Sequence, residues 1–164
     1  MLLTNRLKKY IIIVLLFLEA VMDIRVVGES IFDIESDCIL YFVDNAFTNK
    51  DTLELVEQCG NRILNTFSKI SSIPTGDLKI VPAFDLKADY IILSVIPKSI
   101  ENDEDRHFLK EIFYKIMENF EKYEFNTLAV DIKRLNDSYG KKHCDIFKEC
   151  LRNLDMDIVI FLCK

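Results

Sequence analysis

Short hydrophobic runs in this chain predict strands, and they alternate with stretches in which apolar residues recur at helical spacing. The runs expected as strands are residues 23–27, 38–43, 78–82, 90–96, 127–132 and 157–163. Residues 90–96 contain almost no polar side chain, which is typical of a strand that is covered on both faces. Residues 78–82 alternate between apolar and polar side chains and include a proline, so we expect them near an edge of the sheet.

A first amphipathic helix is predicted after the strand 38–43. Asp51-Thr-Leu-Glu54 fits the capping pattern in which an N-terminal Asp or Ser is followed three residues later by Glu. Gly60 falls inside the predicted helix as a weak point. Its apolar face is expected to consist of Leu53, Val56, Ile63 and Phe67.

Two further helices are predicted in the second half of the chain. Asn102 and the acidic residues after it form an N-terminal cap, and an apolar stripe runs from Phe108 to Phe120. Residues 133–140 are predicted as a polar loop, and residues 141–153 as a helix that turns Cys144 and Phe147 inward. The resulting order β, β, α, β, β, α, β, α, β indicates an α/β fold. We predict a three-layer α/β/α sandwich with a central mixed β-sheet, formed by one domain over residues 22–164.

Residues 1–21 differ from the rest of the chain, because three basic residues precede an apolar run. A signal peptide would explain this pattern, although Glu19-Ala20-Val21-Met22 is a poor cleavage site. A membrane anchor is a second explanation, although the run is shorter than the 20 or so residues that a spanning helix needs. A translation start at Met22 is the third, and it is favoured by the strand that begins at once at Ile24. A membrane partner is expected only if residues 1–21 are retained as an anchor.

Composition and charge narrow the classes of function. The 164 residues carry a net charge of -6, so a protein that grips nucleic acid through a basic face is not expected. The five cysteines are dispersed without a CxxC pair, which predicts buried free thiols in a reducing compartment and a cytoplasmic location. With only two histidines, no metal-ligand spacing is found, and no metal or cofactor is expected. The common phosphate-loop, dinucleotide and hydrolase motifs are absent from the sequence.

The stretch from Thr75 to Pro97 and the start of the domain together match the pattern of a known family. The matching residues of the central stretch are Thr75, Gly76, Ile80, Phe84, Leu86, Ala88, Tyr90, Ile92, Val95 and Pro97. Those at the start are Val26, Val27, Ile31, Ile34, Asp37 and Ile39. Cys59-Gly60-Asn61-Arg62-Ile63-Leu64 is similar to the A-G-x-x-L start of a helix in that family. Over residues 23–164 the chain thus resembles the macro domain, the family that binds ADP-ribose.

The departures from this family fall where its ligand would bind. The family's Gly-Asp, whose carboxylate takes the adenine amino group, is replaced by Glu29-Ser30, and its Asn-Ala-Ala-Asn by Tyr41-Phe42-Val43-Asp44. Residues 47–54 contain no glycine, although the family uses glycines there to bring backbone amides close to phosphates. In the second phosphate loop, Tyr139-Gly140 keeps the aromatic residue and glycine, but the preceding Ser-Thr-Gly is absent.

Candidate ligand-binding residues follow from the resemblance and from the rule that α/β proteins bind ligands beyond the carboxyl ends of their strands. They are Ser30, Ile31, Asp44, Asn45, Asp137, Ser138, Tyr139 and Gly140. A helix-entry turn would equally explain Asp44 and Asn45, and a solvated loop would explain residues 137–140. Asp44 is also the candidate for a catalytic group that orients water.

Three hypotheses of function remain open at this point. The first is a divergent macro-domain-like module that binds ADP-ribose or a related nucleotide. The second is an ADP-ribosyl hydrolase. The third is a non-catalytic scaffold that has lost its pocket, which exposed side chains of Phe42 or Phe47 would favour. An open cleft flanked by Asp44 and Tyr139 would instead favour a ligand.

Overall fold

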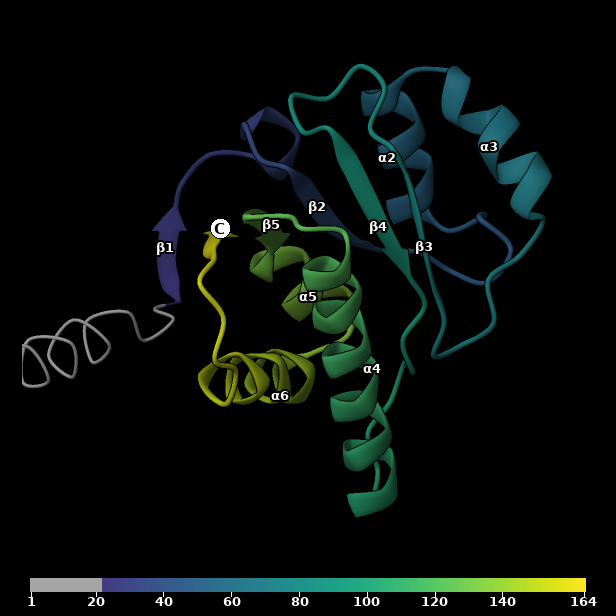
Figure 1. Cartoon of the computed structure of the whole chain (residues 1–164). Coiled ribbons are helices and arrows are strands. Elements are labelled where there is room, and N and C mark those ends of the chain that lie inside the picture. Colours follow the sequence, from purple (N-terminus) through teal and green to yellow (C-terminus); the bar gives the residue numbers. More distant parts are fainter. Residues whose placement is uncertain (1–21) are drawn as a thin grey trace, which may run out of the picture.

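Six strands form one sheet in the computed structural model of the chain, which describes residues 22–164 (Figure 1). The strands are β1 (Asp23–Val27), β2 (Cys38–Phe42), β3 (Leu78–Pro82), β4 (Tyr90–Ser94), β5 (Thr127–Asp131) and β6 (Val159–Cys163). Their order in the sheet is β1-β6-β5-β2-β4-β3. In this part of the chain β3 pairs antiparallel with β4, and the other neighbouring strands are parallel. The predicted mixed sheet is confirmed, with β3 at an edge.

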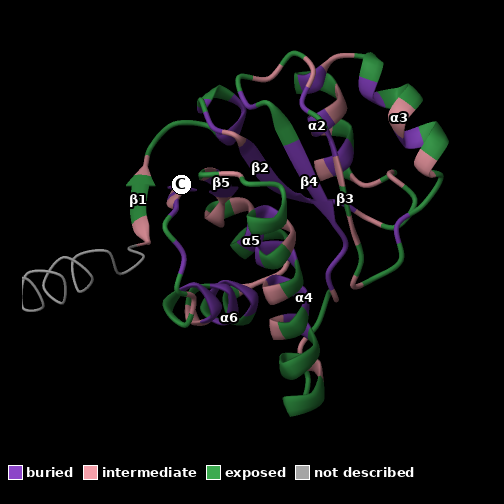
Figure 2. Ribbon diagram, viewed as in Figure 1, coloured by how far each residue is buried: buried purple, intermediate pink, exposed green. Residues whose placement is uncertain are grey.

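Helices cover both faces of the sheet. One face carries α4 (Asp103–Lys122), α5 (Ile132–Ser138) and α6 (Lys141–Arg152). The other carries a 3-10 turn, η1 (Ile31–Asp33), with α2 (Lys50–Cys59) and α3 (Arg62–Ile70). Buried residues gather on the central strands and on the helix faces that turn towards them (Figure 2). The three-layer α/β/α sandwich predicted from the sequence is therefore confirmed.

Strand β2 shows how one short segment supports both layers. Successive side chains of a strand point to opposite faces of the sheet. Leu40 and Phe42 accordingly enter the core beneath α4 and α6, while Ile39 and Tyr41 enter the core beneath α2 and α3. Every residue of β2 is buried, so neither face of this strand requires polar side chains.

The long helix α4 begins as the sequence indicates. The side chain of Asn102 accepts a hydrogen bond from the backbone N–H of Asp105, and three acidic residues occupy the first turn. The buried stripe starts at Leu109, whereas Phe108, predicted to lie in it, is 40% exposed. Neighbouring helical positions point about 100° apart, so the stripe that continues to Ile112 and Ile116 leaves Phe108 outside.

The helix predicted from Asp51 onward is wrong in two respects. It is two helices, because Gly60 has φ of 86° and its N–H closes α2 by bonding to Val56 O. It is capped by Asn49, whose side chain accepts from the N–H of Thr52, and not by Asp51. Its buried residues are Thr52, Leu55 and Cys59. Leu53, expected in the apolar face, is 59% exposed.

The polar loop predicted at residues 133–140 is also wrong, because it is mostly helix α5. The carboxylate of Asp131 caps this helix by accepting from the N–H of Arg134. Leu135 is the one buried residue of α5. Ile132 and Leu135 are the two apolar positions of this seven-residue helix, which is too short for a clear helical periodicity.

The described helices include none that is long and apolar enough to cross a membrane. Residues 1–21, for which we expect a late start, a signal or an anchor, lie outside the described part of the chain.

Candidate functional site

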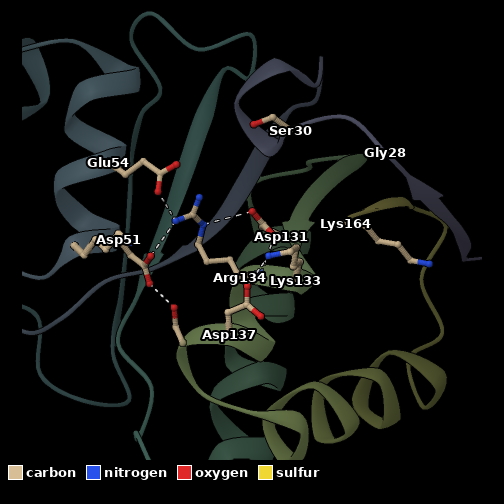
Figure 3. Close-up of a pocket in the computed structure, with 11 residues that line it drawn as sticks. Gly28, Ser30, Asp51, Glu54, Asp131, Lys133, Arg134, Asp137 and Lys164 are labelled. Atoms are coloured by element: carbon tan, nitrogen blue, oxygen red, sulfur yellow. Dashed lines mark hydrogen bonds and ion pairs between the residues drawn. The ribbon is translucent and has the colours of Figure 1, made fainter.

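Two clefts open beyond the carboxyl ends of the parallel strands. The first, here called the Arg134 cleft, has a volume of about 580 Å³ and lies between the loop after β1, the start of α2 and helix α5 (Figure 3). The second, the Asp44 cleft, has a volume of about 420 Å³ and lies between the loop after β2 and the loop after β4. Tyr139 closes one side of the second cleft. Both occupy the edge of the sheet where α/β proteins bind ligands.

Arg134 organises the first cleft. Its Nη1 donates to Asp51 Oδ1 at 2.9 Å and to Glu54 Oε2 at 2.7 Å, and its Nε lies 3.4 Å from Asp131 Oδ2 (Figure 3). The guanidinium also lies over the ring of Tyr41, 5.3 Å from its centre. Among the described residues, Nη2 forms no hydrogen bond, and the buried Nε has no hydrogen-bond partner either, since its contact with Asp131 is an ion pair only. The group thus combines a fixed cation with spare donor capacity.

Arg134 and Glu54 each shift the pKa of the other towards the ionised form. Burial alone would lower the pKa of Arg134, but the bonds from Glu54 and Asp51 and the nearby Tyr41 raise it above its usual range. The hydrogen bond from Arg134 in turn lowers the pKa of Glu54. Arg134 and Glu54 are therefore both ionised near neutral pH. Three carboxylates, those of Asp51, Glu54 and Asp131, surround the one guanidinium.

A hydrogen bond marks the boundary between the two clefts. Ser138 Oγ, at the end of α5, donates to Asp51 Oδ2 at 2.7 Å, at the start of α2. Asp51 and Ser138 line the Arg134 cleft, whereas their close neighbours Asn49 and Tyr139 line the Asp44 cleft. A ligand that occupied both clefts would have to pass this bond.

In the second cleft, the carboxylate of Asp44 is taken up by its own loop. It accepts hydrogen bonds from the backbone N–H groups of Thr48 and Asn49 and from the hydroxyls of Thr48 and Thr52, at 2.8–3.0 Å. Burial raises the pKa of Asp44, but these four donors outweigh it and bring the pKa to about 2. The ionised carboxylate of Asp44 thus holds together the loop that leads into α2. This is the structural role expected of a residue in a helix-entry turn.

Asn45 and Tyr139 both line the Asp44 cleft, and their side chains are held by different contacts. The Asn45 amide donates to Ile73 O at 2.9 Å and to Thr75 Oγ1 at 3.3 Å, which fixes the side chain while its oxygen stays available. The Tyr139 ring packs edge-on against Phe42, and burial raises the pKa of its hydroxyl to about 12. The rim also carries Lys98, which forms no ion pair within residues 22–164.

The sequence candidates fall into three groups. Ser30, Asp137 and Ser138 line the Arg134 cleft, and Asp44, Asn45 and Tyr139 line the Asp44 cleft. Ile31, which is 1% exposed, and Gly140, which precedes α6 with φ of 119°, line neither cleft. Ser30 Oγ accepts from the N–H of Phe32, and Asp137 pairs with Lys133 at 2.7 Å.

Sequence reasoning missed the central cluster of the first cleft. The sequence predicts a loop at Arg134 and a helix cap at Asp51 and Glu54. The one available signal was a basic residue directly beyond a strand end in an acidic chain. Within residues 22–164, no group of three or more His, Cys, Asp and Glu side chains is arranged to hold a metal ion.

Phe42 and Phe47, whose exposure would have favoured a scaffold without a pocket, both pack against other side chains. Phe42 is only 7% exposed, and Phe47 stacks on Phe67 with ring centres 4.2 Å apart. Phe42 therefore offers no exposed apolar surface at the clefts, and the partly buried ring of Phe47 is covered on one face by Phe67.

Comparison with known proteins gives one family. The family model described as Macro domain matches residues 41–131. No curated protein matches the chain in sequence. The solved macrodomain of Trypanosoma brucei is 15% identical with a TM-score of 0.71, and the match covers 85% of this chain and 61% of that one. The same protein has been solved with ADP and with ADP-ribose.

Two other solved structures give the same picture. The macro domain of ganglioside induced differentiation associated protein 2 is 15% identical with a TM-score of 0.70, over 87% of this chain and 77% of that one. A mutant macrodomain of Oceanobacillus iheyensis is also 15% identical with a TM-score of 0.70, over 85% and 83%. This chain spans less than two thirds of the length of the trypanosome protein.

Proposed function

The chain belongs to the macro domain family, and from this premise and the geometry of the two clefts we propose that it is a module that binds ADP-ribose or a related nucleotide. The observation that supports this most directly is the Asp44 cleft, which is open between Asp44 and Tyr139. A cleft of this kind at the carboxyl edge of a parallel sheet suits a nucleotide. Phe42 is buried and Phe47 stacks on Phe67, which argues against a scaffold with a closed pocket.

The two clefts suit the two ends of such a ligand. The nucleoside end would occupy the Arg134 cleft, where the Ser30 hydroxyl and the free Nη2 of Arg134 offer donors to a base or ribose. The second ribose would occupy the Asp44 cleft, between the Asn45 oxygen and the Tyr139 ring. The diphosphate between them would cross the Asp51–Ser138 hydrogen bond, where a carboxylate opposes it. Weak binding is the expected consequence.

A hydrolase is less well supported than a binding module. A catalytic carboxylate must have a free oxygen to orient water. The Asp44 carboxylate instead receives hydrogen bonds from four groups of its own loop. A binding function fits this geometry, because it requires Asp44 only to hold its loop and not to orient water as well.

Calorimetric titration with ADP-ribose tests the proposal. We expect saturable heat, reduced in Tyr139→Ala, while Tyr123→Ala, which removes an aromatic residue that is 55% exposed and lines neither cleft, binds as the wild type does. The absence of heat and of any thermal shift at millimolar ADP-ribose would exclude this ligand.

A second variant tests the path of the diphosphate. Ser138→Ala removes the bond to Asp51 and with it one obstacle between the clefts. A hydrogen bond to a charged group contributes about 1–2 kcal/mol at most where solvent reaches it. We expect ADP-ribose to bind about two- to tenfold more tightly to Ser138→Ala than to the wild type. Weaker binding would show that the Ser138 hydroxyl itself serves the ligand.

A further inference from the structure

We propose that a lysine-lined groove between α5 and α6 binds a phosphate group carried by the nucleoside end of the ligand, so that the preferred ligand has one more phosphate there than ADP-ribose. This inference rests on the proposed function, because it extends the ligand out of the Arg134 cleft. The groove has a volume of about 390 Å³. Its charged walls consist of Lys133, Lys141, Lys148, Lys164 and Asp145.

The balance of charge in the groove is opposite to that of the chain. The whole sequence has 27 acidic and 21 basic residues, and its net charge is -6. Among the side chains that line the groove, four ammonium groups accompany one carboxylate, that of Asp145. A local excess of positive charge in an acidic protein attracts anions to that place.

The sequence builds this groove from two helix faces. Lys141, Cys144, Asp145 and Lys148 follow the spacing i, i+3, i+4, i+7, which places them on one face of α6. Cys144 is buried, and its Sγ lies 3.7 Å from the carbonyl oxygen of Ile132, so α6 packs against the start of α5. Lys133, Lys141 and Lys148 therefore stand on the two packed helices, beside the apolar side chains of Ile132 and Cys144, and Lys164 follows β6.

The ammonium groups are available to a ligand. Lys141, Lys148 and Lys164 form no ion pair with the described residues, whereas Lys110 and Lys115 elsewhere each pair with a carboxylate at 2.8 Å. Lys133 pairs with Asp137 at 2.7 Å, but both side chains are more than half exposed, so an anion can compete for it.

The groove continues the Arg134 cleft, because Lys133 and Lys164 line both. Figure 3 shows these two side chains on the side of the cleft away from Asp51 and Glu54. Four carboxylates line the Arg134 cleft, which balances its four basic groups. A phosphate attached to a nucleoside in the cleft is thus drawn to the groove and not to the cleft itself. A monoester or the next phosphodiester of a longer chain would supply this chemistry.

Binding of ADP-ribose and of ADP-ribose with a 2′-phosphate on its adenosine should be compared by calorimetry in the whole chain. We expect the added phosphate to tighten binding at least fivefold at low salt, and the gain to shrink as salt rises. The double variant Lys141→Gln, Lys148→Gln should lose this gain and keep its affinity for ADP-ribose. Lys69→Gln with Lys87→Gln, two exposed lysines elsewhere with the same loss of charge, should keep the gain.

The outcomes separate this inference from the proposed function. Equal affinity of the two ligands, or an unchanged gain in Lys141→Gln, Lys148→Gln, overturns the groove while the nucleotide site stands. If neither ligand binds, the proposed function is wrong. The groove is then tested by titration with inorganic pyrophosphate, which should shift the NMR signals of the Lys141 and Lys148 amides. The absence of such shifts would overturn the groove as well. A methyl ester of the 2′-phosphate distinguishes the sources, because only a site for a phosphodiester retains the gain with it.

Discussion

Replacing Asp44 by asparagine removes the charge that holds the loop between β2 and α2. The carboxylate accepts from four donors, and an amide of the same shape can satisfy only those that face its oxygen. The pKa of Asp44 is lowered from 3.8 to about 2 in the folded chain. This difference corresponds to about 2 kcal/mol of folding free energy at neutral pH.

The sign of the pH dependence follows from the direction of the shift. A group with a depressed pKa in the folded state stabilises the fold above its unfolded pKa, and this stabilisation is lost as pH falls towards the folded pKa. The contribution of Asp44 should thus be complete at pH 7, begin to fall below pH 4 and be nearly gone at pH 2. The wild type should approach Asp44→Asn in stability over this range.

Urea denaturation of both proteins at pH 7, 5, 4 and 3 measures this difference. At pH 7 we expect Asp44→Asn to be less stable by about 2 kcal/mol, with a melting temperature about 4–8 °C lower. Asp89→Asn is the matched control, because Asp89 is exposed and its side chain makes no hydrogen bond within the described residues. A loss below about 0.5 kcal/mol at pH 7, or one of equal size at pH 7 and pH 3, would refute the reasoning.

Two further predictions concern the backbone and the thiols. Gly60→Ala should lower the free energy of unfolding by about 1–3 kcal/mol in denaturation experiments, because φ of 86° and ψ of 167° are nearly restricted to glycine and a Cβ would also meet Asp85. Gly28→Ala is the control, because a Cβ there meets nothing, and it should be close to neutral. An equal loss in both variants would contradict this account. All five cysteines are free and buried, and burial raises the pKa of Cys59 and Cys163 to about 12, so a thiol reagent at pH 8 should label none in the native chain and five after unfolding. Rapid labelling of the native chain would show that the thiols are accessible.

The strands could be predicted from the sequence because a buried strand consists almost entirely of apolar residues. A strand that pairs parallel with both neighbours and is covered on both faces appears as an uninterrupted apolar run, as β2 does. The helices were harder to delimit. Val56 and Ile63 keep helical spacing across Gly60, so periodicity joined α2 to α3, whereas the family resemblance placed a helix start just after Gly60, where α3 begins. Periodicity reports the face of a helix, and backbone conformation reports its end.

The candidate site could be located from the sequence, but its chemistry could not. Strand ends converge at one edge of a parallel sheet, so Asp44 and Tyr139 were expected near a cleft and line one. The bond between Arg134 and Asp51 joins residues 83 positions apart. It exists because β5 lies beside β2 in the sheet, which brings α5 against the start of α2. Sequence pattern alone does not encode that adjacency.

The position of β6 has a consequence for how the chain folds. It lies between β1 and β5, and it pairs residues 23–27 with residues 159–163. Until β6 docks, β5 presents an open hydrogen-bonding edge and β1 has no partner strand among the described residues. Such long-range parallel pairing is slow, and unpaired edges bind other chains. Sheet completion should therefore be a late step in refolding, and the β5 edge the surface at which a refolding chain aggregates when concentrated.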